Sequence, residues 1–164
     1  MKRSFRPLLD LLADPSAPTS VHDRHEAQNV HIADSLAGLE IPALSEAERI
    51  VDLGAGAGPP GLVLAIARPA AEVVLVESVG KKCAWLELTV EALGLENVRV
   101  VCARAEELAE APFDVVTARA LGSLPVLCEY AAPLLREGGS LVAWKGAVDA
   151  VSYTHLTLPT TPYV

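Results

Sequence analysis

One stretch decides the fold of this chain: DLGAGAGPPG, residues 52–61. The apolar pair Ile50-Val51 precedes it and the apolar run 62–66 follows it, which is typical of a strand, a glycine-rich turn and a helix. Glycine adopts positive φ at little cost and has no Cβ to keep a ligand away from the backbone. The stretch therefore predicts a cofactor-binding loop between a strand and a helix.

The spacing of the glycines distinguishes this loop from a dinucleotide-binding one. A dinucleotide-binding loop has the pattern G-x-G-x-x-G, and its third glycine lies where the helix meets the strand. Here the third glycine comes one residue early, at Gly58, and Pro59 stands in the expected place. The pattern D-x-G-x-G-x-G instead resembles motif I of the class I S-adenosylmethionine-dependent methyltransferases.

Two acidic residues flank the loop in a way that fits this pattern. Glu77 ends the apolar run 73–76, at about the distance where such folds place a carboxylate for the hydroxyl groups of a ribose. Asp52 precedes the glycines, and we expect it to hold the loop by accepting backbone hydrogen bonds. The alternative is a plain strand-to-helix turn in which Glu77 is an ordinary surface acid.

Beyond residue 48 the chain alternates apolar strand-like runs with helical ones, which is typical of an α/β fold with a parallel sheet between helices. The pattern predicts strands at 49–53, 72–76, 97–102, 113–117 and 139–144, and helices at 60–68, 80–93, 104–109 and 123–135. Right-handed crossovers bring the carboxyl ends of such strands to one edge. That edge is predicted to carry Gly54, Glu77, Arg104, Arg119 and Lys145.

The two ends of the chain differ from this core, which we place at 45–150. Residues 1–44 are expected to form an N-terminal helical cap, with helices at 5–13 and 23–39. Residues 151–164 are threonine-rich, contain two prolines and no charged residue, and are expected to be a non-native tail. The strands that should complete the sheet would then be missing. The alternative is a short edge strand with a disordered end.

Composition limits the class of protein. A length of 164 residues suits one domain, and a net charge of −8 argues against a general nucleic-acid binder. No apolar run reaches the ~18–20 residues of a membrane span, so a soluble, cytoplasmic protein is expected. Cys83, Cys102 and Cys128 share no metal-ligand spacing, so we expect no metal and three reduced thiols.

Five short motifs narrow the resemblance to one family. They are HIADS at 31–35, GPPG at 58–61, ESVGKK at 77–82, ARA at 118–120 and WKG at 144–146. Their order and spacing resemble the glucose-inhibited division protein B family. That family methylates nitrogen-7 of a guanine in bacterial small-subunit (16S) ribosomal RNA. The resemblance implies a Rossmann-like class I methyltransferase sheet, S-adenosyl-L-methionine as cofactor, and 16S ribosomal RNA or the small ribosomal subunit as partner of a monomer without membrane contact.

The resemblance also implies roles for single residues. Gly54 and the turn formed by Gly56, Gly58 and Pro59 would face the methionine part of the cofactor. Glu77 would bind the ribose, Ala105 and Glu106 the adenine, and Arg119 the methionine carboxylate. Arg119, Lys145 and Arg104 are the candidate catalytic residues, and Lys145, Arg104 and Lys81 are placed by position to hold RNA phosphates.

Several of these residues have alternative interpretations. Arg119 is also a candidate for a surface ion pair, and Lys145 for an ordinary solvated lysine. His31 and Asp34 lie one helical turn apart and are candidates to pair with each other. Pro59 replaces a residue that is commonly leucine in the family, and the N-terminal helices are short for it.

The chemistry implied needs no general base, because nitrogen-7 of guanine already has an in-plane lone pair. The enzyme must align the acceptor, the methyl group and the sulfur, and must stabilise charge that moves from the sulfur to the purine. Two alternatives stay open on sequence alone. One is a class I methyltransferase that acts on a small molecule or protein, which the acidic charge would suit. The other is an inactive fragment that binds the cofactor.

Overall fold

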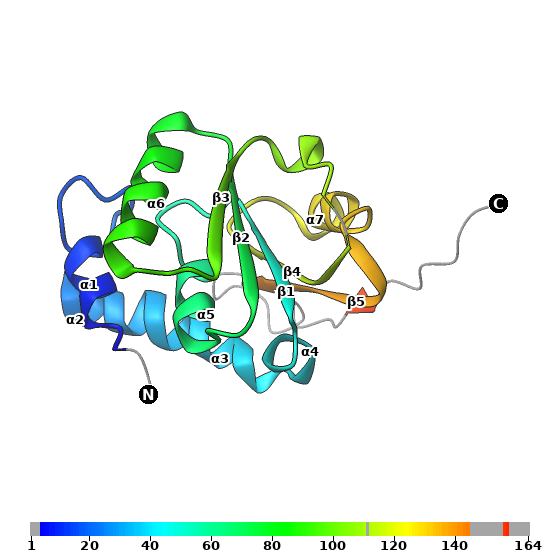
Figure 1. Ribbon diagram of the computed structural model, residues 1–164, viewed down its shortest axis with the longest axis horizontal. Coiled ribbons are helices and arrows are strands. Elements are labelled where there is room, and N and C mark those ends of the chain that lie inside the picture. Colours follow the sequence, from blue (N-terminus) through cyan, green and yellow to red (C-terminus); the bar gives the residue numbers. More distant parts are fainter. Residues whose placement is uncertain (1–3, 111, 145–155, 158–164) are drawn as a thin grey trace.

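Six strands form one sheet in the order β3-β2-β1-β4-β5-β6 (Figure 1). The computed structural model describes residues 4–110, 112–144 and 156–157. Strands β1 to β5 are parallel, and β6 is antiparallel to β5. The bounds are β1 (Arg49–Leu53), β2 (Glu72–Glu77), β3 (Val98–Cys102), β4 (Phe113–Arg119), β5 (Leu135–Trp144) and β6 (Leu156–Thr157).

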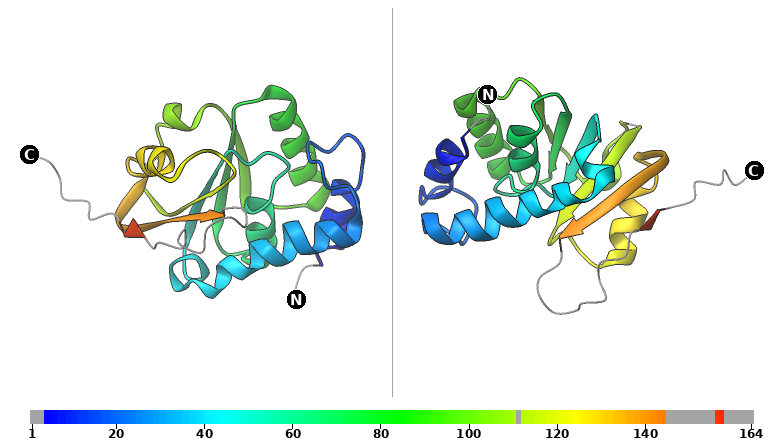
Figure 2. Two further views of the ribbon diagram at one scale, coloured as in Figure 1. Left: turned by 180° about the vertical axis from the view of Figure 1, so that it is seen from behind. Right: turned by 90° about the horizontal axis from the view of Figure 1, so that it is seen from below.

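The cap precedes the sheet and consists of α1 (Arg6–Leu12) and a long helical stretch. This stretch, which we call the cap helix, runs through α2 (Arg24–Ala27), a π-helical turn (Gln28–Ala33), α3 (Asp34–Ala37) and a 3-10 turn (Gly38–Glu40). Figure 2 shows it as one helix along the side of the molecule. The remaining helices are α4 (Pro42–Ser45), α5 (Gly61–Ala67), α6 (Gly80–Leu93), a 3-10 turn (Ala105–Glu107) and α7 (Leu124–Ala131).

Side chains alternate between the two faces of the sheet, as the pleat of a strand requires. Ile50 packs on one face with residues of the cap, α5 and α6, among them Leu8 and Leu86. Val51 packs on the other face with residues of α7, among them Leu127. The cap therefore shares an apolar core with the sheet and covers one of its faces.

Most predicted elements are confirmed within a few residues. Helix α6 has the predicted bounds and ends at Gly94, whose φ of +59° is typical of a glycine that terminates a helix. The predicted helix at 104–109 is wrong, because only a 3-10 turn forms there. The helix predicted to reach residue 135 ends at Ala131, because Leu135 already pairs with Phe113 in the sheet.

The cysteines depart from expectation, and part of the C-terminal segment forms a strand. Cys83 and Cys102 form a disulfide with a Cα–Cα distance of 5.7 Å, so the prediction of reduced thiols is wrong for both. The first turn of α6 lies beside the end of β3, a contact that their separation of 19 residues does not reveal. In β6, Leu156 and Thr157 pair with β5, as the edge-strand alternative expected. The rest of the predicted tail lies outside the described residues.

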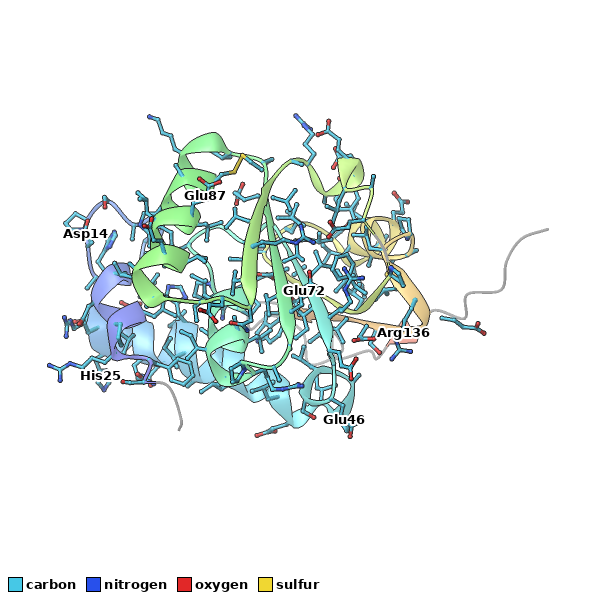
Figure 3. The ribbon with its side chains drawn as sticks, viewed as in Figure 1. Asp14, His25, Glu46, Glu72, Glu87 and Arg136 are labelled. Carbon is cyan, nitrogen blue, oxygen red and sulfur yellow. A yellow bond between two sulfur atoms is a disulfide. The ribbon has the colours of Figure 1, made fainter. Side chains whose placement is uncertain are left out.

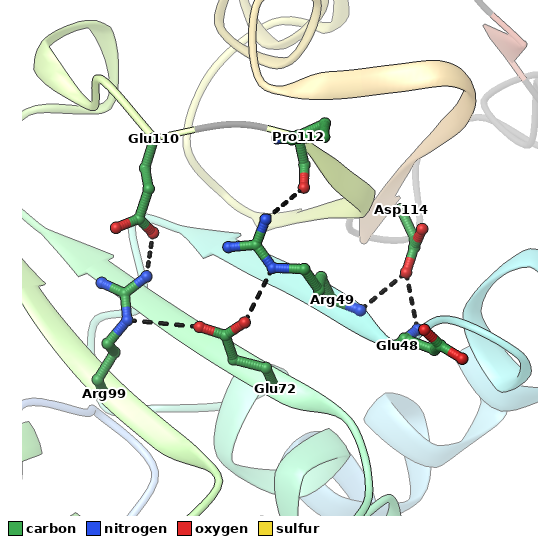
Figure 4. A network of polar contacts seen from close by, with 7 residues as sticks. All are labelled: Glu48, Arg49, Glu72, Arg99, Glu110, Pro112 and Asp114. Carbon is green, nitrogen blue, oxygen red and sulfur yellow. Dashed lines mark hydrogen bonds and ion pairs between the residues drawn. The ribbon is translucent and has the colours of Figure 1, made fainter.

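The amino-terminal ends of the strands are joined by a polar network (Figure 4). Arg49 Nε lies 2.9 Å from Glu72 Oε2, and Arg99 pairs with Glu72 and Glu110. Asp114 accepts the amides of Glu48 and Arg49, each at 2.8 Å. The side chains of Arg49, Glu72, Arg99 and Glu110 are thus paired with one another. Other labelled polar residues, such as His25 and Glu46, lie at the periphery in Figure 3.

Two carboxylates of this network, Glu72 and Asp114, are stabilised in their charged form. Hydrogen bonding and charge from Arg49 hold the pKa of Glu72 below its ordinary value. Burial acts to raise the pKa of Asp114, but hydrogen bonds from Arg136 and two backbone amides outweigh it and lower that pKa. The glycine loop lies at the opposite edge, after the carboxyl end of β1. None of the described helices is long and apolar enough to cross a membrane.

Candidate cofactor-binding site

The glycine loop joins β1 to α5 where the strand order reverses. Strand β1 lies between β2 and β4, and crevices at such a switch point bind ligands in open α/β sheets. Gly54, Gly56 and Gly58 have φ values of +69°, +56° and +111°. Residues that have a side chain rarely adopt such φ values. The backbone conformation of the loop therefore requires glycine at these three positions.

A fourth glycine, Gly61, lets the helix pack closely against the strands. In dinucleotide-binding loops the third glycine of the pattern has this role. A Cβ on Gly61 would lie 2.3 Å from Leu75 Cδ2 and 2.7 Å from Asp52 Oδ2. The helix therefore approaches β1 and β2 at Gly61, two residues beyond Pro59, which stands where the dinucleotide pattern has its third glycine. A glycine at the first residue of the following helix was the available signal.

Asp52 holds the end of the loop by accepting a backbone hydrogen bond, as predicted. Its side chain is only 1% exposed. Oδ2 accepts the Gly61 amide at 3.0 Å, and Oδ1 accepts the Thr117 hydroxyl at 2.8 Å. Burial raises the pKa of the Asp52 carboxyl to about 7, against hydrogen bonds from Thr117 and Gly61 that lower it. Thr117 was not anticipated, because its contact with Asp52 spans 65 residues.

Asp52→Asn is expected to gain stability relative to the wild type as pH rises from about 4 to about 7. Over this range the folded wild type keeps a proton on Asp52 that the unfolded chain, with the ordinary pKa of 3.8, releases. The wild type thus loses up to about 4 kcal/mol of unfolding free energy, at about 1.4 kcal/mol for each pKa unit. Asparagine has no such proton to lose. Urea denaturation at pH 5 and pH 8 measures the difference.

Asp114→Asn is the control, because Asp114 lies at the other end of the sheet and its pKa is lowered. The stability that Asp114 contributes is present above its ordinary pKa and is lost only as pH falls below it. This variant should therefore differ from the wild type by the same amount at pH 5 and pH 8. A similarly constant difference for Asp52→Asn would contradict the raised pKa of Asp52.

Glu77 lies at the end of β2 and is tied to the loop. It is 6% exposed, so it is not an ordinary surface acid. Oε2 accepts the Gly56 amide at 2.9 Å, and Oε1 accepts the amides of Ser78 and Val79 at 2.8 and 3.0 Å. Ionised carboxylate oxygens accept further hydrogen bonds. Glu77 therefore orders the loop and keeps the capacity to accept hydroxyl groups.

Arg119, at the end of β4, reaches the cap helix. Its Nη2 donates to the Val30 carbonyl at 2.7 Å and forms an ion pair with Asp34. The side chain is only 22% exposed, and Nη1 is buried without a hydrogen-bond partner among the described residues. The ion-pair alternative is thus observed, and one buried donor is left over. His31 Nε2 contacts Thr19 Oγ1 at 3.1 Å and His31 Nδ1 has no hydrogen-bond partner among the described residues, so His31 forms no hydrogen bond with Asp34 there.

The other predicted site residues are more scattered. Ala105 and Glu106 lie in the 3-10 turn after β3, and Glu106 pairs with Arg104 at 3.6 Å. Arg104 is 70% exposed, and β2 and β1 separate its strand from that of Arg119, so the fold does not bring these arginines together. Lys145 lies outside the described residues. No group of three metal-ligating side chains occurs within the described part of the chain.

Comparison with known proteins identifies the family. The sequence model described as rRNA small subunit methyltransferase G, or GidB, matches residues 8–157. The chain belongs to this family. The resemblance inferred from the five motifs is therefore confirmed.

Curated relatives in this family carry the name ribosomal RNA small subunit methyltransferase G. That of Rubrobacter xylanophilus is 46% identical over 123 residues, which are 72% of this chain and 47% of the relative. That of Roseiflexus castenholzii is 47% identical over 140 residues, 80% of this chain and 58% of the relative. The chain spans about half the length of these relatives.

Solved structures confirm the class I methyltransferase fold. A protein-L-isoaspartate O-methyltransferase superposes with a TM-score of 0.57 at 28% identity, over 66% of this chain and 35% of that one. Cofactor-bound Rv0187 superposes with a TM-score of 0.62 at 22% identity, over 84% of this chain and 64% of that one. This chain therefore has the α/β sheet and the N-terminal helical cap that its sequence predicted.

Proposed function

We propose that this chain transfers a methyl group from S-adenosylmethionine to nitrogen-7 of a guanine in small-subunit ribosomal RNA. The observation that carries the proposal is the ordered glycine loop bonded to Glu77 at the switch point, in a member of this family. The relatives' name supports ribosomal RNA as the acceptor. Ribosomal RNA as the acceptor in turn favours a cytoplasmic enzyme, which we infer to be monomeric.

The residues present fit the cofactor. At Gly56 the loop backbone is open to the methionine part, since among the described residues only Gly54 O, at 3.8 Å, lies within 4 Å of a Cβ built there. In this proposal Glu77 accepts the ribose hydroxyls, and Ala105 and Glu106 border the adenine. The unpartnered Nη1 of Arg119 supplies a buried cationic donor that suits the methionine carboxylate.

The cofactor supplies the methyl group on a sulfonium, and the protein's share of the reaction is placement. Arg119 and Glu77 would fix the two ends of the cofactor, so that the methyl group points to the acceptor base. Such alignment contributes several kcal/mol to catalysis by avoiding the entropy loss of a free encounter. No protein base is required, since the attacking nitrogen has a free lone pair. Arg104, Lys81 and Lys145 remain proposed contacts for RNA phosphates.

Transfer of a labelled methyl group to small ribosomal subunits that lack the modification tests the proposal. Label is expected in the RNA, on the single guanine that is unmethylated in those subunits, and none on subunits that already carry the modification. A full-length relative serves as positive control. Label that enters protein or a small molecule instead would contradict the assigned acceptor. Failure of this chain to bind the cofactor would contradict methyl transfer by it altogether.

A further inference from the structure

The guanidinium of Arg119 has one satisfied edge and one unsatisfied nitrogen. Nη2 contacts both the Val30 carbonyl and Asp34, whereas Nη1 is buried without a partner among the described residues. A buried donor left unpaired is costly and rare in proteins, so such a group calls for an explanation. The guanidinium is planar, so fixing Nη2 also fixes the direction of Nη1. The contacts on Nη2 therefore decide where the free donor points.

The first of these contacts depends on the π-helical turn in the cap helix. In an α-helix the Asp34 amide would bond the carbonyl of Val30, four residues earlier. Here the Asp34 amide bonds the carbonyl of Asn29, five residues earlier. The Val30 carbonyl accepts Arg119 Nη2 at 2.7 Å instead. The extra residue in this turn thus gives the arginine a backbone acceptor that a regular helix would use internally.

The second contact, Asp34, is itself anchored to the sheet. Trp144 Nε1, at the end of β5, donates to the Asp34 carbonyl at 2.9 Å. The Ser35 hydroxyl donates to the His31 carbonyl at 2.5 Å within the same turn. The Trp144 bond therefore ties the backbone of Asp34 to the end of β5, and the Asp34 carboxylate pairs with Arg119 from there.

We propose that Asp34 is a positioning residue for Arg119. Together with the Val30 carbonyl it holds Nη2, so that Nη1 is directed to the carboxylate of the cofactor's methionine part. This inference rests on the proposed function, because it names what orients a cofactor contact. It assigns the cap helix a part in cofactor binding besides covering the sheet.

Calorimetric titration of Asp34→Ala with two ligands tests this role. S-adenosylhomocysteine carries the carboxylate, whereas 5′-methylthioadenosine shares the nucleoside and lacks the amino-acid part. Asp34→Ala is expected to bind S-adenosylhomocysteine about tenfold more weakly and 5′-methylthioadenosine as tightly as the wild type. Asp34→Asn keeps an acceptor oxygen of the same shape and should restore affinity to within about threefold. It also serves as the folded reference should the alanine variant unfold.

Glu26→Ala, in the same cap helix but away from Arg119, is the matched control and should leave both affinities unchanged. Equal losses for the two ligands in Asp34→Ala would overturn the proposal, since they would indicate a general effect on the fold. Unchanged binding of S-adenosylhomocysteine would overturn it as well. If the wild type binds neither ligand, the proposed function fails first, and the positioning role fails with it.

Discussion

Glu77→Gln is expected to weaken binding of S-adenosylmethionine by about 100-fold. The carboxylate accepts three backbone amides, from Gly56, Ser78 and Val79. Glutamine offers one acceptor oxygen, so an amide group would meet the Gly56 amide donor to donor. A buried amide without its acceptor costs about 1–3 kcal/mol, and the loss of charge weakens the bonds proposed to the ribose hydroxyls. Titration calorimetry on the wild type and the variant measures the effect.

Glu72→Gln is the matched control for this variant. Glu72 lies at the other end of the same strand and belongs to the polar network of Figure 4. Its replacement should reduce stability slightly, because the pairs it forms are exposed, and should leave the affinity for the cofactor unchanged. An affinity of Glu77→Gln within twofold of the wild type would contradict the assignment of Glu77 to the ribose.

Trp144→Ala is expected to lower the free energy of unfolding by about 2–4 kcal/mol and to loosen the cap helix. The indole donates to the Asp34 carbonyl, and a Cβ on Gly38 would lie 2.4 Å from its Cζ2 atom. The tryptophan ring thus rests on the backbone of the cap helix where glycine leaves room. Removal of a large aromatic side chain from such a contact leaves a cavity and an unpaired carbonyl. Hydrogen exchange measures the loosening. Compared with the wild type, the variant should exchange its cap-helix amides faster, with a smaller change in the α6 amides.

Trp85→Ala is the matched control. Like Trp144, Trp85 is partly buried against the apolar core on the Ile50 face of the sheet, but it belongs to α6. Trp85→Ala should lower stability without a selective loss of protection in the cap helix. If Trp144→Ala loosened both helices equally, the proposed attachment of the cap through Trp144 would be wrong. If attachment is as described, the variant should also weaken the hold of Asp34 on Arg119.

Prediction from sequence worked best where one residue limits its own backbone or its near neighbours. The three positive-φ glycines and the C-cap at Gly94 were identified because only glycine adopts those conformations cheaply. The strands were found because continuous apolar runs alternate with helical segments, as in a parallel sheet that is buried on both faces. The helix predicted at 104–109 failed, because the propensity of so short a segment is easily overridden by the packing around it.

The sequence by itself determined the order of strands and helices, the glycine loop, and the acids Asp52 and Glu77 at the strand ends. These features depend on the apolar pattern and on the backbone sterics of neighbouring residues. They could therefore be predicted without knowledge of tertiary contacts. Only the tertiary structure decided that Asp52 meets Thr117, that Arg119 meets Asp34 and that Trp144 meets the cap helix. These contacts span 65, 85 and 110 residues, and they form because the parallel sheet brings the carboxyl ends of its strands to one edge under the cap helix.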